Sequence, residues 1–393
     1  MFSHRLPDNL EPNEFSKLLA RKRAEGARLL DLTESNPTKA GIPYPKDEIL
    51  EALTDGRSLV YEPSPVGIRE AREAVSVYYA EQHAIVHPDQ VVITASTSEA
   101  YAYIFKLLSD PGDRFLVPSP SYPLFDLLAA MERVTLSPYR LEYDESSKRW
   151  RALWDTLEFR GLRARGIIVV NPNNPTGSCL DEAERDELRG ISTSHRLPVI
   201  CDEVFSDYAG REVRGWTESL QPGTGPLSFS MSGLSKVCGL PQLKLGWIVV
   251  HGVPREVVTT VQRLAFIADT YLSVGTPIQL AARRLLKLRH SVQFAIRDRL
   301  HVHRLSLAAG CHRTGGACRL LASDGGWYAV VEVPASLTDE EWALALLEKD
   351  NVVVHPGYFF GFGREAFLVI SLLPATDVFE EGVARLIART CPA

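Results

Sequence analysis

Short apolar, β-branched runs alternate with helix-patterned segments over residues 60–250, and this alternation restricts the folds open to the chain. It is typical of a mostly parallel sheet covered by helices on both faces. In such sheets ligands bind beyond the carboxyl ends of the strands, so we expect the polar residues that follow these runs to converge. The runs are VVIT (91–94), RFLVPSP (114–120), GIIVVNP (166–172), PVICDEVF (198–205), LSFSMS (227–232) and LGWIVV (245–250).

The remaining third of the chain predicts a second, smaller α+β domain. A long helix is expected over residues 279–310, because its apolar residues recur at spacings of three and four. HVH at 301–303 indicates neither a metal nor a nucleic-acid site, because residues two apart do not share a helix face. Strands are expected at 328–333, 352–356 and 367–373, with a helix at 337–349. The expected boundaries are 46–284 for the large domain, and 1–45 with 285–393 for the small domain.

Composition excludes several classes of protein. The 393 residues are 45% hydrophobic and 23% charged, which suits a large folded core rather than disorder. A net charge of −6 gives no global positive field for nucleic acid or anionic lipid. The six cysteines form no CxxC pair, so no zinc cluster or disulfide framework is predicted. Without a signal-like or membrane-length apolar segment, a soluble cytoplasmic protein is expected.

Three chemically distinct side chains follow three successive predicted strands. Asn174 lies in the turn NPNNPTG, Asp202 ends PVICD, and Lys236 follows LSFSMS in the segment MSGLSKVCGLPQLKLGW. Each has an ordinary structural explanation as a turn residue, a cap or a surface charge. A lysine in an apolar pocket, however, loses its proton more easily and can form a Schiff base with a carbonyl. A buried carboxylate can hold a proton on a ring nitrogen.

This combination of motifs, from about Leu32 to the C-terminus, resembles the class I/II aminotransferases of the aspartate aminotransferase superfamily, which are fold-type I pyridoxal-phosphate enzymes. The resemblance implies that Lys236 forms the Schiff base with pyridoxal phosphate and then moves a proton during transamination. Asp202 is implied to pair with the pyridinium nitrogen, and Asn174 to hydrogen-bond the ring 3-oxygen. No metal is implied.

Further cofactor contacts are implied by the same resemblance. The segment TASTSEAY opens a predicted helix, so Ser96, Thr97 and Ser98 would cradle the phosphate, although such residues are also ordinary helix caps. Tyr122 in SPSYP matches the aromatic residue that stacks on the ring. Tyr61 in YEPSPVG matches a tyrosine that reaches the phosphate of the neighbouring subunit, which implies a homodimer.

Several positions depart from the family pattern. Lys244 stands where an arginine usually binds phosphate, Gly233 replaces a serine, and Phe205 replaces a tyrosine that donates to the ring 3-oxygen. The largest departure is Val369, because an arginine there normally binds the substrate carboxylate through two hydrogen bonds.

Burying an unpaired carboxylate costs several kcal/mol, so the carboxylate would need another partner. Ser35 stands opposite, where glycine is usual. Arg364 and Lys39 are candidate substitutes, or ordinary solvated surface residues.

The resulting hypothesis is an aminotransferase acting on an amino donor and an oxo-acid acceptor. Another pyridoxal-phosphate reaction on the same scaffold remains open, such as β- or γ-elimination, cyclisation or an oxidative step, and the missing arginine favours it. A non-catalytic ligand-sensing domain is the third reading. We find no appended helix-turn-helix or basic region in the sequence, which counts against the ligand-sensing reading.

Overall fold

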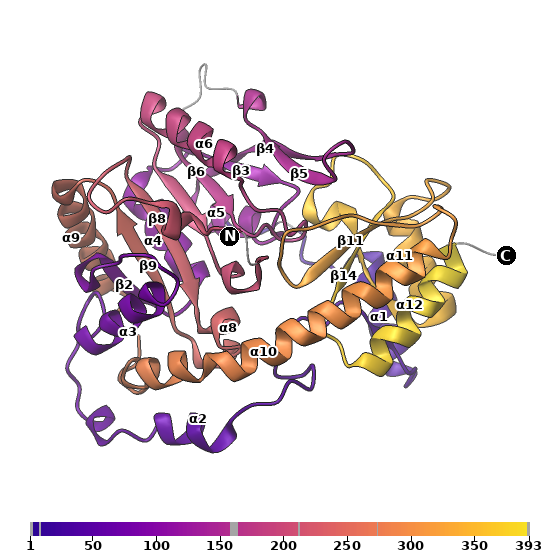
Figure 1. The fold of residues 1–393 in the computed structure, drawn as a ribbon, viewed down its shortest axis with the longest axis horizontal. Helices are drawn as coiled ribbons and strands as arrows, with labels where there is room; N and C mark the ends of the chain where they lie inside the picture. Colours follow the sequence, from indigo (N-terminus) through magenta and orange to yellow (C-terminus); the bar gives the residue numbers. More distant parts are fainter. Residues whose placement is uncertain (1–2, 8, 158–163, 211–212, 273, 391–393) are drawn as a thin grey trace.

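The protein is an α/β structure built around one large sheet, as a computed structural model describes it for residues 3–7, 9–157, 164–210, 213–272 and 274–390 (Figure 1). The large sheet has eight strands in the order β2-β9-β8-β7-β6-β3-β4-β5. Strands β8, β7, β6, β3 and β4 run parallel, while β9 and β5 pair antiparallel. The predicted fold class is confirmed.

All six strand runs predicted between residues 91 and 250 are present in this sheet. The hairpin of β4 and β5 was not predicted, because its residues alternate with charged ones and carry no continuous apolar run. The strands are β2 (Val91–Thr94), β3 (Arg114–Ser119), β4 (Thr135–Asp144), β5 (Arg149–Leu153), β6 (Ala164–Val170), β7 (Val199–Asp202), β8 (Ser228–Gly233) and β9 (Gly246–His251).

Helices cover both faces of the large sheet, and side chains alternate between them. Val92 packs with α4, α5 and α9, whereas its neighbour Ile93 packs with α3, α8 and α10. The helices around this sheet are α2 (Lys46–Ala52), α3 (Arg69–Ala80), α4 (Thr97–Leu108), α5 (Phe125–Glu132), α6 (Glu182–His195), α7 (Trp216–Ser219), α8 (Leu234–Val237), α9 (Pro254–Tyr271) and α10 (Thr276–His312).

A smaller group of elements lies beside the carboxyl ends of the parallel strands. The predicted C-terminal strands are present, and β1 of the N-terminal arm pairs with β12. These elements are α1 (Glu14–Ala24), β1 (Leu30–Asp31), β10 (Arg319–Leu320), β11 (Tyr328–Glu332), α11 (Asp339–Asp350), β12 (Val352–Val353), β13 (His355–Pro356), β14 (Phe367–Ser371) and α12 (Thr376–Thr390).

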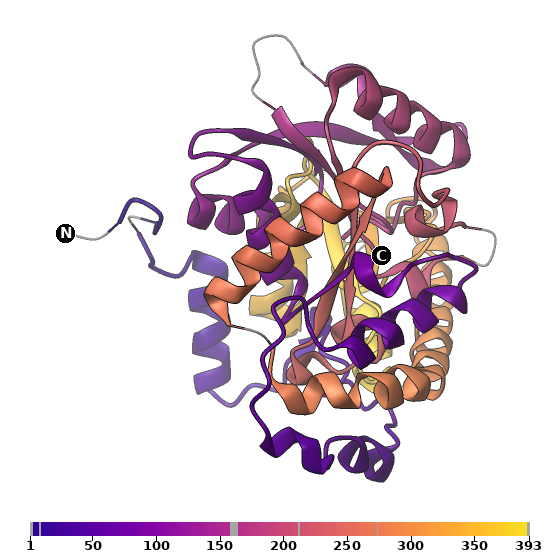
Figure 2. The same ribbon diagram turned by 90° about the vertical axis from the view of Figure 1, so that its left-hand side faces the viewer.

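Helix α10 spans both groups, and both views show it along one side of the molecule with α2 on its outer side (Figures 1 and 2). Within the HVH segment, His303 is buried, hydrogen-bonds the Leu372 carbonyl at 2.9 Å and stacks on Phe379. No group of three metal-ligating side chains lies together among the described residues. None of the described helices combines the length and apolar character needed to cross a membrane.

Candidate active site

A cavity of about 360 Å³ lies at the carboxyl ends of β6, β7 and β8. Because these three strands are parallel neighbours, they deliver Asn174, Asp202 and Lys236 to the same edge of the sheet. Eight of the nine residues predicted for the site line this one cavity: Lys236, Asp202, Asn174, Tyr122, Ser96, Thr97, Ser98 and Lys244. The ninth, Tyr61, does not line it and is 78% exposed.

Lys236 is held at the cavity between aromatic rings. Its Nζ lies 4.5 Å from the ring centroid of Trp327 and 5.4 Å from that of Phe205. The Tyr208 hydroxyl fixes the backbone by donating a hydrogen bond to the Lys236 carbonyl at 2.9 Å. Burial lowers the pKa of Lys236 to about 8, and the nearby Asp202 charge opposes this shift. A neutral, nucleophilic amine is therefore accessible near physiological pH.

Asp202 is a buried carboxylate aimed at the same cavity. Its Oδ2 accepts a hydrogen bond from the Tyr101 hydroxyl at 3.1 Å, and its Oδ1 accepts one from the Val204 amide at 3.1 Å. Burial raises the pKa of Asp202 to about 6, because these bonds and Lys236 only partly offset desolvation. A cationic ring nitrogen next to it would supply the missing charge partner.

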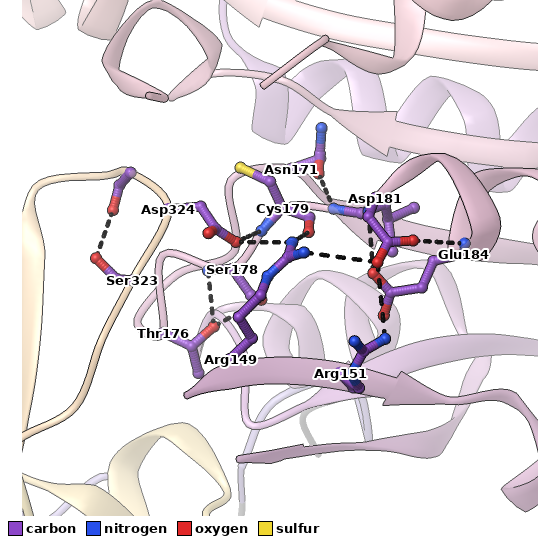
Figure 3. A network of polar contacts seen from close by, with 12 residues as sticks. Arg149, Arg151, Asn171, Thr176, Ser178, Cys179, Asp181, Glu184, Ser323 and Asp324 are labelled. Carbon is purple, nitrogen blue, oxygen red and sulfur yellow. Dashed lines mark hydrogen bonds and ion pairs between the residues drawn. The ribbon is translucent and has the colours of Figure 1, made fainter. Parts of the chain in front are cut away.

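The turn that carries Asn174 is fixed by a polar network (Figure 3). The Asp324 carboxylate accepts a hydrogen bond from the Cys179 amide at 3.0 Å and lies 3.5 Å from Arg149 of β5. Arg149 also lies 3.5 Å from Asp181, the cap of α6. The turn is thereby tied to β5, to α6 and to the segment that precedes β11.

Asn174 itself is buried, and its Oδ1 has no hydrogen-bond partner among the described residues. A buried polar atom without a partner is costly. An orphaned amide that lines a cavity is therefore suited to a polar ligand.

The start of α4 forms another wall. Ser96 is the N-cap of this helix and accepts a hydrogen bond from the Glu99 amide at 3.1 Å, so the ordinary capping explanation holds for its hydroxyl. The same residue lines the cavity with Thr97 and Ser98, where the helix N-terminus favours an anion. Lys244 adds a positive charge to the cavity lining, with its backbone in the left-handed region at a φ of 49°.

Neither proposed replacement for the missing arginine lies in this cavity. Arg364 is 2.6 Å from Glu332 and stacks over the Phe367 ring, while Lys39 is exposed. Val369 is fully buried in an apolar cluster with Phe367 and Phe360. The solvated-surface reading of Arg364 and Lys39 agrees with the structure.

Three aromatic residues at the site were not predicted: Trp327 beside Lys236, Tyr328 on the cavity wall and Tyr101 on Asp202. The only available signal was their position in the sequence. Trp327 directly precedes the strand predicted at 328–333, Tyr328 opens that strand, and Tyr101 is in the helix predicted after 91–94.

Comparison with known proteins decides the family. The sequence pattern of the family described as aminotransferase class I and II matches residues 27–386. The chain belongs to the class I and II aminotransferases. It is therefore a pyridoxal-phosphate-dependent enzyme that transfers an amino group between an amino acid or amine and an oxo acid, which confirms the family resemblance, the function and the cofactor expected from the motifs.

Relatives in sequence and structure carry the same description. The chain is 23% identical over 385 residues to the glutamate-pyruvate aminotransferase AlaA of Haemophilus influenzae, covering 93% of this chain and 91% of that one. It is 25% identical over 397 residues to the alanine aminotransferase of Mycobacterium bovis, covering 93% and 86%. A crystal structure of an Escherichia coli aminotransferase superposes with a TM-score of 0.86 at 23% identity, covering 100% and 98%.

The residues at the cavity fit pyridoxal phosphate. Asn174 lines the cavity, where its amide N–H can donate to the ring oxygen. The buried Asp202 carboxylate suits a protonated ring nitrogen, and the α4 terminus with Lys244 suits a phosphate. Tyr122 lines the cavity and provides an aromatic face. This aminotransferase therefore keeps the donors that the cofactor needs, although three of the usual residues are replaced.

Gly233 cannot simply be returned to the serine usual in the family. A Cβ at this position would lie 2.9 Å from the Leu245 carbonyl oxygen and 3.0 Å from the Gly246 Cα, both backbone atoms. Gly233→Ser is therefore expected to lower the free energy of unfolding by about 1–3 kcal/mol through overpacking. Urea denaturation measures this. A variant as stable as the wild type, with tighter cofactor binding, would contradict the prediction.

Proposed function

We propose that Lys236 is the amine that binds pyridoxal phosphate covalently and that afterwards carries a proton from the substrate carbon. The observation that carries this proposal is the convergence of Lys236, Asp202 and Asn174 from adjacent strands on one cavity. When bound, the cofactor supplies a ring that accepts the electron pair left on that carbon. The lowered pKa of Lys236, about 8, suits an amine that must both give and take a proton.

The other residues hold and orient the cofactor in this proposal. Asp202 keeps the ring nitrogen protonated, Asn174 donates its amide N–H to the ring oxygen, and Tyr122 stacks on the ring. Ser96, Thr97, Ser98 and Lys244 bind the phosphate. Relatives named for alanine, glutamate and pyruvate make these compounds the first donors and acceptors to test.

We further propose a homodimer in which Tyr61 reaches the phosphate of the partner's site. Tyr61 follows Leu59 and Val60, which are 91% and 62% exposed, so this run is an apolar surface in the single chain. Light scattering should give twice the mass of the chain, and Tyr61→Phe should weaken cofactor binding although Tyr61 is distant from its own cavity. A monomer that binds the cofactor normally would contradict the dimer.

The domain division at 46–284, and at 1–45 with 285–393, is also proposed. One buried cluster supports it, because its members come from the two terminal segments, with Phe205 and Tyr208 as the exceptions. A cytoplasmic location is proposed as well. Its support is that Cys179, Cys201 and Cys238 are free and buried.

The proposed role of Lys236 is tested with the purified enzyme and added pyridoxal phosphate. A visible absorbance band should appear on binding, and an amino donor should replace it with the spectrum of the amine form of the cofactor. An oxo acid should then restore the first spectrum. A donor that releases ammonia without restoring the band would contradict transamination at this site.

Lys244→Ala is expected to weaken cofactor binding by about tenfold to a hundredfold, because one charge-assisted contact to the phosphate is lost. Equilibrium dialysis against pyridoxal phosphate measures the affinity. Lys39→Ala is the matched control, since Lys39 is exposed and does not line the cavity. An equal loss of cofactor affinity in both variants would show that the overall positive charge of the protein, rather than a contact of Lys244 in the cavity, is responsible.

A further inference from the structure

The wall of the cavity that lacks the usual arginine carries a tyrosine instead. In the second sheet, Tyr328 of β11 pairs with Ser371 of β14, and Val330 pairs with Val369. Residues two apart share a sheet face, so Tyr328 and Val369 face the same way as diagonal neighbours. Tyr328 lines the cavity beside Lys236, whereas Val369 does not. A phenol that lines the cavity therefore lies diagonally across from the position of the missing guanidinium.

A second hydroxyl lies with it. The Ser35 side chain hydrogen-bonds Tyr328 and lines the same cavity. The segment carrying Ser35 is fixed, because the Ser371 hydroxyl donates to the Glu34 carbonyl at 2.7 Å. Burial raises the pKa of Tyr328, so its phenol keeps its proton and remains a hydrogen-bond donor at neutral pH. When a carboxylate enters, the Ser35 hydroxyl can turn its proton away from Tyr328, so the pair then offers two neutral donors next to Lys236.

We propose that the hydroxyls of Tyr328 and Ser35 bind the carboxylate of the amino-acid and oxo-acid substrates, in place of the arginine that Val369 replaces. This proposal rests on the proposed function, since it assumes that the reacting nitrogen lies at Lys236. Hydrogen bonds from neutral donors to a carboxylate are weaker than a guanidinium pair. Substrate carboxylates therefore bind loosely, and both half-reactions use the same anchor.

The outer part of the site selects among carboxylates. A second cavity of about 400 Å³ shares Lys236 and Ser35 with the first and is lined by Asp31 and Glu34. Asp31 is occupied by hydrogen bonds from the Thr33 amide and hydroxyl. One oxygen of Glu34 accepts from the Asn36 amide at 2.8 Å, and no described cation forms an ion pair with this side chain. A second substrate carboxylate would be repelled by these charges, so we expect monocarboxylic substrates to be preferred over dicarboxylic ones.

The proposed carboxylate-binding role of Tyr328 and Ser35 is tested by measuring the affinity for a carboxylate rather than turnover. Propanoate, which has no amine to react, is titrated into the cofactor-loaded enzyme by calorimetry. Tyr328→Phe and Ser35→Ala should each weaken its binding about tenfold, and Ser35→Thr, which keeps a hydroxyl, should not. Tyr358→Phe is the matched control, because Tyr358 lies on the surface with its hydroxyl 3.2 Å from Glu340.

Reaction with propylamine, which lacks a carboxylate, should be unchanged by the anchor variants. Unchanged propanoate affinity in both Tyr328→Phe and Ser35→Ala would overturn the anchor, and so would an equal loss in Tyr358→Phe. If Tyr328→Phe does not fold, the difference in propanoate affinity between Ser35→Ala and Ser35→Thr tests the proposal. An enzyme that forms no Lys236-dependent absorbance band with pyridoxal phosphate would contradict the proposed function instead. Failure of the carboxylate-binding proposal can therefore be distinguished from failure of the proposed function.

The preference for monocarboxylates has its own test. Succinate should bind more weakly than propanoate, and Glu34→Gln should raise succinate affinity about fivefold while leaving propanoate affinity nearly unchanged. Glu48→Gln removes the same charge from an exposed helix position away from the cavities and should change neither affinity. Succinate binding tighter than propanoate in the wild type would overturn this part of the proposal.

Discussion

Lys236→Ala is expected to lower transamination by about 10⁴-fold or more, because we propose that the same amine binds the cofactor and moves the proton. The visible band formed with pyridoxal phosphate should also be lost, while phosphate contacts at the start of α4 and Lys244 remain. Steady-state kinetics and absorbance measure the two effects on the same preparation. Lys39→Ala provides the control, since that lysine is exposed.

A variant that loses the band but keeps more than a small fraction of the activity would separate the two roles assigned to Lys236. A variant that keeps both would show that the aromatic setting of Lys236, between Trp327 and Phe205, is structural. Circular dichroism of the variant is needed in either case. It confirms that the loss does not come from misfolding.

Asp202→Asn is expected to lower the transamination rate by about 10³-fold, because the ring nitrogen loses the charge that keeps it protonated. The amide oxygen can still accept from the Val204 amide, and the amide NH2 can donate to the Tyr101 hydroxyl oxygen, so the side chain keeps two partners. Single-turnover conversion of the bound cofactor by an amino donor isolates this effect from substrate exchange. A rate close to that of the wild type would contradict the assigned role.

The same substitution should stabilise the protein when the cofactor is absent. Burial raises the pKa of Asp202 from 3.8 to about 6. Between these pH values the unfolded chain releases the proton while the folded chain keeps it, so wild-type stability is lost as pH rises through this window. Asp202→Asn should therefore gain about 1–3 kcal/mol above pH 6 and nothing below pH 4. Urea denaturation at pH 4 and pH 7.5 tests the sign.

The positions of the chemical groups could be predicted from the sequence because each follows an apolar run. Asn174, Asp202 and Lys236 stand directly after strands whose burial leaves little choice of register, and parallel strands present their carboxyl ends together. The spacing between these three residues therefore predicted that they meet, whereas the other five predicted residues that line the cavity were implied by the family resemblance.

The substrate wall could not be predicted in the same way. Tyr328 reaches the site only because β11 and β14 pair in a register that places it diagonally to Val369, and that pairing joins segments about forty residues apart. Trp327 and Tyr101 read as ordinary core aromatics in the sequence. The lack of space for a side chain at Gly233 comes from the backbone of Leu245 and Gly246, and a sequence pattern does not reveal this close approach.

Two lysines line the cofactor cavity, so the most direct test is to identify the one that bonds to the cofactor. The loaded enzyme is reduced with sodium borohydride, digested and analysed by peptide mass spectrometry. We expect the added cofactor mass on Lys236 and none on Lys244. Attachment at Lys244, or at a lysine outside the cavity, would contradict the central claim.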